Sequence, residues 1–445
     1  MKIWDKGFSI DKRIEAFTIG RDRELDVWLA SFDVLGSMAH SHMLHKIGLL
    51  EEKELTQLLE GLKAIYQKVE AGEFVIEEGI EDVHSQVELM LTRKLGDVGK
   101  KVHSGRSRND QVLLDLRLYI RHEIQALVTL SQQLFNTLIK LSERHKEVLM
   151  PGYTHTQVAM PSSFGLWFGA YAESLVDDLI LMDAAFRVAN QNPLGSAAGY
   201  GSSFPLDRSM TTELLGFETM SYNVVYAQMG RGKVEKTLSF AMSSLAATLG
   251  KMAADVCLYM SQNFGFISLP DQLTTGSSIM PHKKNPDVFE LMRAKANKLQ
   301  ALPNEIALTI GNLTSGYHRD LQLVKESFLP AIEDLKNCLG IADYMLQHLQ
   351  VKDNILDDEK YKYLFSVEAV NEEVLKGTPF RDAYKKIGAQ IADGSYQVSR
   401  ELKHTHEGSL GNLCNDKIEE KMQALVSAFP FDKIEQALKH LLDQA

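Results

Sequence analysis

The sequence contains 445 residues, of which 44% are hydrophobic and 24% are charged, and its formal net charge is −11. This balance is typical of a globular protein of two or three domains, and it disfavours a nucleic-acid-binding protein, which needs a positively charged surface. Three scattered cysteines without paired spacing, and the lack of a long apolar run, predict a soluble cytoplasmic protein without a signal peptide or membrane span.

Helical patterns begin early in the chain, and residues 1–110 are expected to form an N-terminal helical domain. The strongest pattern follows between Gly105 and Pro151, where leucine and isoleucine recur every three or four residues. It predicts a single helix of about 40 residues and roughly 60 Å. A helix of this length is typical of a bundle or of the core of an oligomer.

Four more helical segments are predicted over residues 163–189, 233–262, 287–310 and 318–349. Pro303 and Pro330 are expected to end or kink their helices. The best strand candidate is YNVVYAQ at 222–228. The expected fold is therefore all-α, with a long central helix bundle over residues 111–355 and a C-terminal domain of shorter helices over 356–445.

Polar side chains gather in HSGRSRNDQ at 103–111, just before the longest predicted helix. Ser107 and Asn109 are possible helix caps, which is the structural alternative for this segment. Arg106 and Arg108 are unfavourable beside the positive end of a helix dipole, and their forked donors suit carboxylates. We therefore expect an anionic group near this segment.

Two further polar segments have weaker patterns. In PGYTHTQ at 151–157, His155 is flanked by two threonines, although a single histidine is more often structural. In YHRDLQLVKE at 317–326, four polar residues recur at helical spacings, which also fits a solvated helix face: Tyr317, Arg319, Gln322 and Lys325.

The segment TTGSSIMPHKKNP at 274–286 combines a glycine, two serines and two lysines in a short loop. It matches neither a phosphate-binding P-loop nor a nucleophile elbow. Gly276 allows close approach to a ligand, and Lys283 with backbone N–H groups could hold an anion and help Ser277 to lose its proton. An exposed basic loop, the alternative, does not explain this clustering.

The sequence contains no metal-binding cluster and no dinucleotide fingerprint. The polar segments lie at predicted helix ends, which a bundle can bring together, within one chain or between subunits. These residue types indicate proton transfer beside a carboxylate, without a cofactor or metal.

GSSIMPHKKNP resembles the fumarase/aspartase superfamily signature GSSxMPxKxNP at every fixed position. Within the superfamily, EDVH at 81–84, RSRNDQV at 106–112, GYTHTQ at 152–157 and DLQLVKE at 320–326 are similar to the argininosuccinate lyase family, and the likeness covers about residues 18–330. The resemblance implies an all-α homotetramer whose active sites each combine three subunits. The implied reaction is the reversible anti-elimination of argininosuccinate to arginine and fumarate.

The resemblance also implies roles for individual residues. Ser277 is the expected general base, or Ser278 if the alignment shifts by one residue. His155 is expected on the general-acid side, with its imidazole held by Glu290. Lys283 is expected to stabilise the carboxylate on which charge develops.

Substrate binding is implied for a larger polar set, in which Asn285 shares the carboxylate with Lys283, and to which Asp22 is a plausible addition. This set contains Thr18, His84, Ser107, Arg108, Asn109, Thr154, Ser278, Asn285, Tyr317, Gln322 and Lys325.

Three segments depart from the family pattern: WDKGFS at 4–9, MGRGKVEK at 229–236, and Tyr384, where histidine is common. The first two lie where recognition of the amino-acid end is expected. Two alternatives therefore stay open. One is another fumarate-releasing lyase, such as adenylosuccinate lyase or an aspartase, and the other is a catalytically silent scaffold of the same fold.

Overall fold

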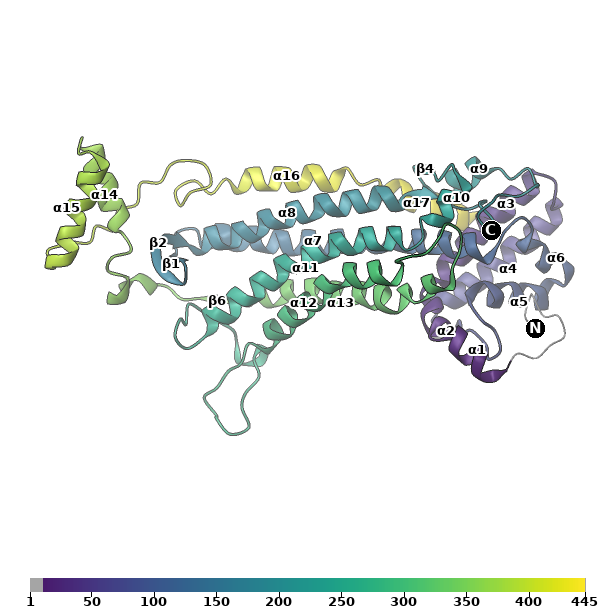
Figure 1. Cartoon of the computed structure of the whole chain (residues 1–445), viewed down its shortest axis with the longest axis horizontal. Coiled ribbons are helices and arrows are strands. Elements are labelled where there is room, and N and C mark those ends of the chain that lie inside the picture. Colours follow the sequence, from purple (N-terminus) through teal and green to yellow (C-terminus); the bar gives the residue numbers. More distant parts are fainter. Residues whose placement is uncertain (1–10, 445) are drawn as a thin grey trace.

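The computed structural model describes residues 11–444, so the divergent segment at 4–9 lies outside the described residues. Short and medium helices form one end of an elongated molecule (Figure 1). They pack around a core of their own that includes Val34, Leu58 and Leu91. These helices are α1 (Lys12–Ile19), α2 (Asp22–Leu25), α3 (Ala30–Lys46), α4 (Glu52–Glu70), α5 (Val83–Leu95) and α6 (Asp97–Lys100).

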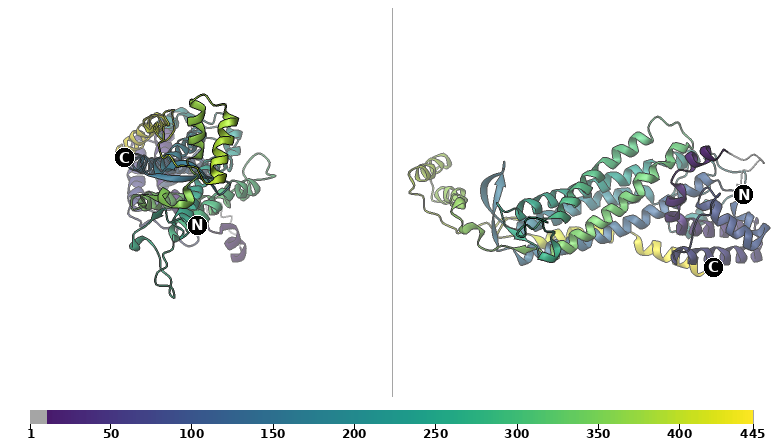
Figure 2. Two further views of the ribbon diagram at one scale, coloured as in Figure 1. Left: turned by 90° about the vertical axis from the view of Figure 1, so that its left-hand side faces the viewer. Right: turned by 90° about the horizontal axis from the view of Figure 1, so that it is seen from below.

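Five long helices then run side by side along most of the length of the molecule (Figure 2). The 37-residue α7 confirms the long helix predicted before Pro151, and at 1.5 Å per residue it spans about 55 Å. The other four confirm the helical segments predicted after it. The bundle consists of α7 (Arg108–Arg144), α8 (Phe164–Ala189), α11 (Lys233–Met260), α12 (Asp287–Thr309) and α13 (Val324–Gln347).

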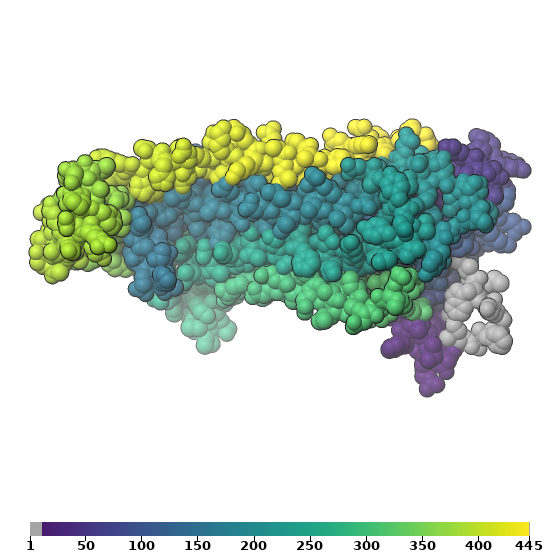
Figure 3. Space-filling model, turned by 45° about the horizontal axis from the view of Figure 1, so that its top comes forward, coloured from purple at the N-terminus to yellow at the C-terminus, as the bar shows by residue number. Residues whose placement is uncertain are grey.

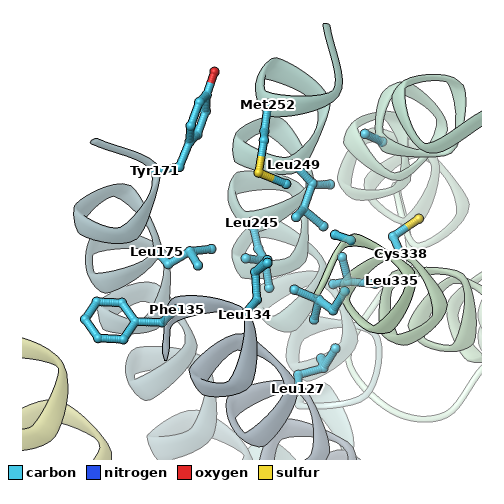
Figure 4. Close-up of a cluster of buried hydrophobic side chains, with 14 of the residues drawn as sticks. Leu127, Leu134, Phe135, Tyr171, Leu175, Leu245, Leu249, Met252, Leu335 and Cys338 are labelled. Carbon is cyan, nitrogen blue, oxygen red and sulfur yellow. The ribbon is translucent and has the colours of Figure 1, made fainter. Parts of the chain in front are cut away.

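The bundle core is built from the leucine-rich faces of these helices (Figure 4). Leu134 of α7, Leu245 of α11 and Leu335 of α13 each have no exposed surface. Burying such a side chain contributes about 1.5–3 kcal/mol, so the shared core outweighs the helix propensity of any single segment.

Pro303 and Pro330 lie inside α12 and α13, and neither ends its helix, as the sequence had suggested they could. Pro303 is buried between Leu302 and Ile306 on the packed face of α12. Tertiary packing there outweighs the backbone hydrogen bond that proline cannot donate.

Three two-stranded sheets connect the helices, and the longest is an antiparallel hairpin of β1 (Leu149–Thr154) and β2 (Gln157–Ser163). The pairs β3 (Gln191–Asn192) with β4 (Thr219–Met220), parallel, and β5 (Ile267–Ser268) with β6 (Gln350–Val351), antiparallel, are shorter.

The strand expected at 222–228 is wrong, because this segment forms most of α10 (Val224–Met229), which follows α9 (Arg208–Leu214). The Asn223 side chain accepts hydrogen bonds from the backbone N–H groups of Val225 and Tyr226. This N-cap starts a helix where the β-branched and aromatic residues alone favour a strand.

The last part of the chain forms α14 (Ser366–Leu375), α15 (Phe380–Asp393), α16 (Asn415–Ser427) and α17 (Phe431–Asp443). The α14–α15 pair lies at the far end of the bundle and has a small core of its own (Figure 2). Helices α16 and α17 then run back along the bundle, as the yellow surface shows (Figure 3). The domain boundaries near residues 110 and 355 stay predictions. Among residues 11–444, no helix is long and apolar enough to cross a membrane.

Candidate active site

A cavity of about 430 Å³ lies where the N-terminal helices meet the adjoining end of the bundle. Seven residues of the expected substrate-binding set line it: His84, Ser107, Arg108, Asn109, Tyr317, Gln322 and Lys325. The structure therefore brings together segments that are more than 200 residues apart in sequence.

The start of α7 fixes one wall of this cavity. The Ser107 side chain accepts a hydrogen bond from the Asn109 backbone N–H, and the Asp110 carboxylate accepts one from the Ser107 backbone N–H. The buried Asp110 carboxylate also accepts N–H bonds from Gly195 and Ala197. Ser107 is thus the cap that the sequence allowed, and the capping box holds this wall against the 190–209 loop.

For Arg108, the anionic groups expected near the 103–111 segment are carboxylates of the chain itself, whereas Arg106 donates a hydrogen bond to the Ser37 hydroxyl at 3.0 Å. Arg108 pairs with Glu81 at 3.2 Å and also with Asp82, and Arg319 pairs with Glu81. Although burial works in the opposite direction, the positive charges of His84 and Arg108 lower the pKa of Asp82. These pairs fix the positions of the Arg108 and Arg319 side chains at the cavity.

Lys325 is buried at the base of the cavity beside two carboxylates. Its Nζ lies 2.8 Å from Oδ1 of Asp22 and also pairs with Asp26. Burial raises the pKa of Asp22 to about 6, against the opposing effect of Lys325. Although burial alone would lower the pKa of Lys325, the two carboxylates raise it. The base of the cavity therefore holds an ammonium and carboxylates together.

Sequence reasoning gave no site role to four cavity residues, Asp26, Glu81, Asp82 and His103. Arg319 and Arg231 also line the cavity, and in the sequence they stand out only by helical spacing and by position in a divergent segment. Asp26 follows Asp22 at a spacing of four, which places two carboxylates on one helical face and is a readable signal. Arg231 lies in the divergent 229–236 segment, and its guanidinium stacks on the Tyr317 ring at 5.4 Å. This arginine thus keeps a place in the cavity.

Thr18 lies next to the cavity and is not one of its lining residues. Its backbone carbonyl accepts a hydrogen bond from Gln322 at 3.0 Å, and its hydroxyl donates to the Ile14 carbonyl. In this chain, Thr18 therefore orients Gln322 through its backbone.

The His155 segment lies elsewhere, at the tip of the β1–β2 hairpin near the opposite end of the bundle (Figure 1). His155 and Thr156 form the two-residue turn, with φ values of 53° and 59°. Such turns require positive φ at both positions and usually contain asparagine and glycine. Positive φ is energetically unfavourable for a β-branched residue such as threonine. Backbone strain of this kind is concentrated at functional sites. Thr154 and His155 are both exposed.

The Ser277 segment forms a third group, on a long loop that projects from the bundle before α12 (Figure 1). Pairing between Thr275 and Asn285 closes the base of this loop, with a backbone hydrogen bond of 2.9 Å. The Ser277 Oγ accepts N–H bonds from Met280 at 3.2 Å and Ile279 at 3.4 Å.

The two lysines of this loop differ in their partners. Lys284 pairs with Asp271, whereas within residues 11–444 Lys283 forms no ion pair. Ser278 is exposed on the same loop, and Glu290 is exposed on the first turn of α12. Lys283 is therefore the lysine whose charge remains available to an anion.

Within one chain, the structure thus brings most of the expected binding residues together at the cavity. The His155 hairpin and the Ser277 loop lie apart from this cavity and from each other (Figure 1). His155 and Glu290, which the resemblance pairs, lie on separate elements without a direct contact in the described part of the chain. Within one copy of the chain, the residues expected to act on one substrate therefore lie in three separate places.

The chain is similar to proteins of one class. A family model described as lyase matches residues 6–301. Two solved structures share the fold, an EDDS lyase variant with bound fumarate and a class II fumarase from Schistosoma mansoni. The first has a TM-score of 0.79 at 19% identity and covers 99% of this chain and 95% of that one. The second has a TM-score of 0.72 at 17% identity and covers 94% and 95%. The family model therefore defines this chain as a lyase, and the solved structures share its mainly helical fold.

Curated relatives narrow this class. A protein of Parabacteroides distasonis and one of Bacteroides fragilis, both named argininosuccinate lyase, are each 63% identical over 441 residues, which are 99% of both chains. One from Thermotoga neapolitana with the same name is 39% identical over 386 residues, which are 87% of this chain and 97% of that relative. The chain belongs to the argininosuccinate lyase family, and it is a carbon–nitrogen lyase.

Proposed function

We propose that this chain reversibly cleaves argininosuccinate to arginine and fumarate by anti-elimination, as a step of arginine synthesis in the cytoplasm. The observation that carries this proposal is the 63% identity, over 99% of both chains, to proteins named argininosuccinate lyase. The cavity supports it, because its ammonium, guanidinium and carboxylate groups suit a substrate that carries both charges.

The reaction begins with removal of a proton from the carbon beside a succinyl carboxylate, and Ser277 is the base. Its Oγ accepts N–H bonds from Met280 and Ile279, and these backbone dipoles favour an ionised oxygen. The proton moves to Oγ, and the electron pair of the C–H bond moves into the adjacent carboxylate.

This intermediate carries two negative charges at one end, and Lys283 and Asn285 bind that end. Lys283 has no competing ion pair within residues 11–444. A fixed cation stabilises the doubly charged intermediate more than the substrate, which is how it increases the rate.

The carbon–nitrogen bond then breaks, and the departing guanidino nitrogen takes a proton from His155. Glu290 orients and polarises this imidazole from another copy of the chain. The tight hairpin turn limits the positions that His155 can adopt, which favours a fixed proton donor.

The remaining substrate-binding residues hold the two ends of the substrate. Ser107, Arg108, Asn109 and Thr154 bind the succinyl part. Tyr317, Gln322 and Lys325 contact substrate carboxylates or the arginyl end, with Asp22 beside them.

The active form in this proposal is a homotetramer in which each site combines three copies. Large apolar side chains remain exposed on four helices of the bundle, and packing between copies would bury them. They are Ile180 and Leu181 of α8, Phe240 and Leu258 of α11, Leu291 and Leu308 of α12, and Ile341 and Tyr344 of α13.

The proposal is tested by incubating the purified protein separately with argininosuccinate, adenylosuccinate and aspartate while fumarate is followed by its ultraviolet absorbance. Fumarate from argininosuccinate alone, with equimolar arginine, is the expected result. Fumarate from another substrate would replace the proposed substrate but keep the lyase chemistry. No release from any of the three would refute the proposal.

A further inference from the structure

A buried group of three titratable side chains lies at the wall of the cavity. The Nδ1 atom of His84, on α5, lies 2.7 Å from Oδ1 of Asp33, on α3, and 3.5 Å from Oδ2 of Asp115, on α7. The exposed fractions of these residues are 6%, 2% and 1%. Three helices that meet here therefore place one imidazole between two carboxylates.

The 2.7 Å contact between His84 Nδ1 and Asp33 Oδ1 is a hydrogen bond. The residue types of this group would also suit a cation, but the direct contact to Asp33 uses the ring nitrogen that would be the ligand. With Nδ1 engaged by Asp33, Nε2 is the remaining ring nitrogen, and His84 lines the cavity. A carboxylate that holds one imidazole nitrogen fixes the ring and favours its protonated form.

The charges around His84 favour a positive ring. Although burial opposes it, Asp33 and then Asp115 and Asp82 raise the pKa of His84 to about 9. Burial and the Asp33 charge raise the pKa of Asp115 well above its usual value. The groups whose charges act on the ring are Asp33 on α3, Asp82 at the start of α5, Asp115 on α7, and His103 between α6 and α7. The charge of Arg106, on the same segment as His103, acts on Asp33 and Asp115.

We infer that Asp33 and Asp115 are positioning residues that keep His84 as an imidazolium, whose Nε2–H donates to a carboxylate of the bound substrate. Neither aspartate lines the cavity, so each acts through His84. This inference rests on the proposed function, because that function supplies the dicarboxylate substrate. It distinguishes His84 from His103, whose pKa burial and nearby Arg106 lower to about 4 and which therefore stays neutral.

The test is the pH dependence of KM for argininosuccinate in Asp33→Asn. Without the Asp33 charge, the His84 ring loses its proton at a lower pH. KM should then rise by about tenfold at pH 8.5 and return close to the wild-type value near pH 6, with a smaller change in kcat. His84→Asn should raise KM at both pH values, because it has no ring to protonate.

A matched control is Asp178→Asn, which changes a carboxylate that is equally buried but lies in the bundle. Asp178 is 3% exposed and accepts hydrogen bonds from Ser244 and Thr248. The KM of Asp178→Asn for argininosuccinate should depend on pH as that of the wild type does. If Asp33→Asn does not fold, Asp115→Asn gives the same test with a smaller expected shift, because its carboxylate is farther from Nδ1.

A rise in KM that is equal at pH 6 and pH 8.5, or no rise at all, would overturn the inference and leave Asp33 a structural residue. Calorimetric titration of the same variants with succinate separates this result from failure of the proposed function. If the wild type releases no fumarate from argininosuccinate, the function fails. A succinate affinity of Asp33→Asn that recovers at pH 6 would still support the role of His84.

Discussion

Ser277 poses the main chemical question at the residue scale, because a serine hydroxyl is a weak base near neutral pH. Its Oγ lies at the centre of a small turn and accepts two backbone N–H bonds, whereas Ser278 is exposed on the same loop. The two neighbouring serines therefore differ in the one property that basicity requires. This difference supports our proposal that Ser277, rather than Ser278, is the base.

We predict that Ser277→Ala lowers kcat by about 10²–10⁴, the usual contribution of a positioned base. Ser278→Ala, in the same loop, should lower kcat by less than about tenfold, because it removes only a binding contact. Steady-state fumarate release measures both. The reverse order of the two effects would assign the base to Ser278.

The His84–Asp33 pair also predicts a dependence of stability on pH. A histidine whose pKa rises from about 6.5 to about 9 on folding contributes stability that is complete below pH 6.5 and is lost as the pH rises through 9. The contribution is on the order of 3 kcal/mol. Thermal unfolding should show a larger fall in Tm between pH 6.5 and pH 9.5 for the wild type than for His84→Asn. Parallel falls in Tm would contradict this prediction.

At the element scale, the β1–β2 hairpin has one task in our proposal, which is to hold His155. Thr156 has φ 59°, a conformation that suits glycine and that proline cannot adopt. Thr156→Gly should therefore leave kcat nearly unchanged and stabilise the turn by up to about 1 kcal/mol. Thr156→Pro should abolish activity.

Circular dichroism and size-exclusion chromatography provide the control for the two Thr156 variants. The hairpin lies outside the bundle core, so both variants should keep the helical content and the assembly state of the wild type. Full activity in Thr156→Pro would show that the turn geometry is not required for proton transfer.

The elements also show what could be predicted from the sequence. The helices α7, α8, α11 and α12 follow directly from apolar residues at spacings of three and four. The segment of α10 could not be predicted in this way, because the Asn223 side chain, a single cap, outweighs the strand-like pattern after it. That Pro303 does not end α12 could not be predicted for a related reason, because a local sequence pattern contains no information about packing against neighbouring helices.

The sequence could predict which residue types form the candidate site. It could not predict which of these side chains pair with one another. The sequence indicated that Arg108 needs an anion, but it could not show that Glu81 and Asp82 already provide one. Such contacts depend on how α5 packs against α7. For the same reason, the arrangement of Asp33, His84 and Asp115 is a property of the folded chain, although the sequence itself shows EDVH as a motif.

At the scale of the whole molecule, the elongated shape supports our proposal that each active site combines several copies. The cavity lies at one end of the bundle, whereas the His155 hairpin lies near the other, and the Ser277 loop projects from the bundle between them (Figure 1). The exposed apolar faces of α8, α11, α12 and α13 offer a surface on which copies can pack. Four copies of the 49.9 kDa chain would have a mass of about 200 kDa.

Sharing of active sites between copies is the central claim, and hybrid assemblies of two inactive variants test it most directly. Ser277→Ala and His155→Asn are mixed, dissociated in mild denaturant and allowed to reassemble, and fumarate release is then measured. If each site takes Ser277 and His155 from different copies, about a quarter of the sites in a random equal mixture regain both residues. The hybrids should therefore recover about a quarter of wild-type activity. Activity that stays at the level of the separate variants, in hybrids proven by mass to contain both chains, would contradict a site shared between copies.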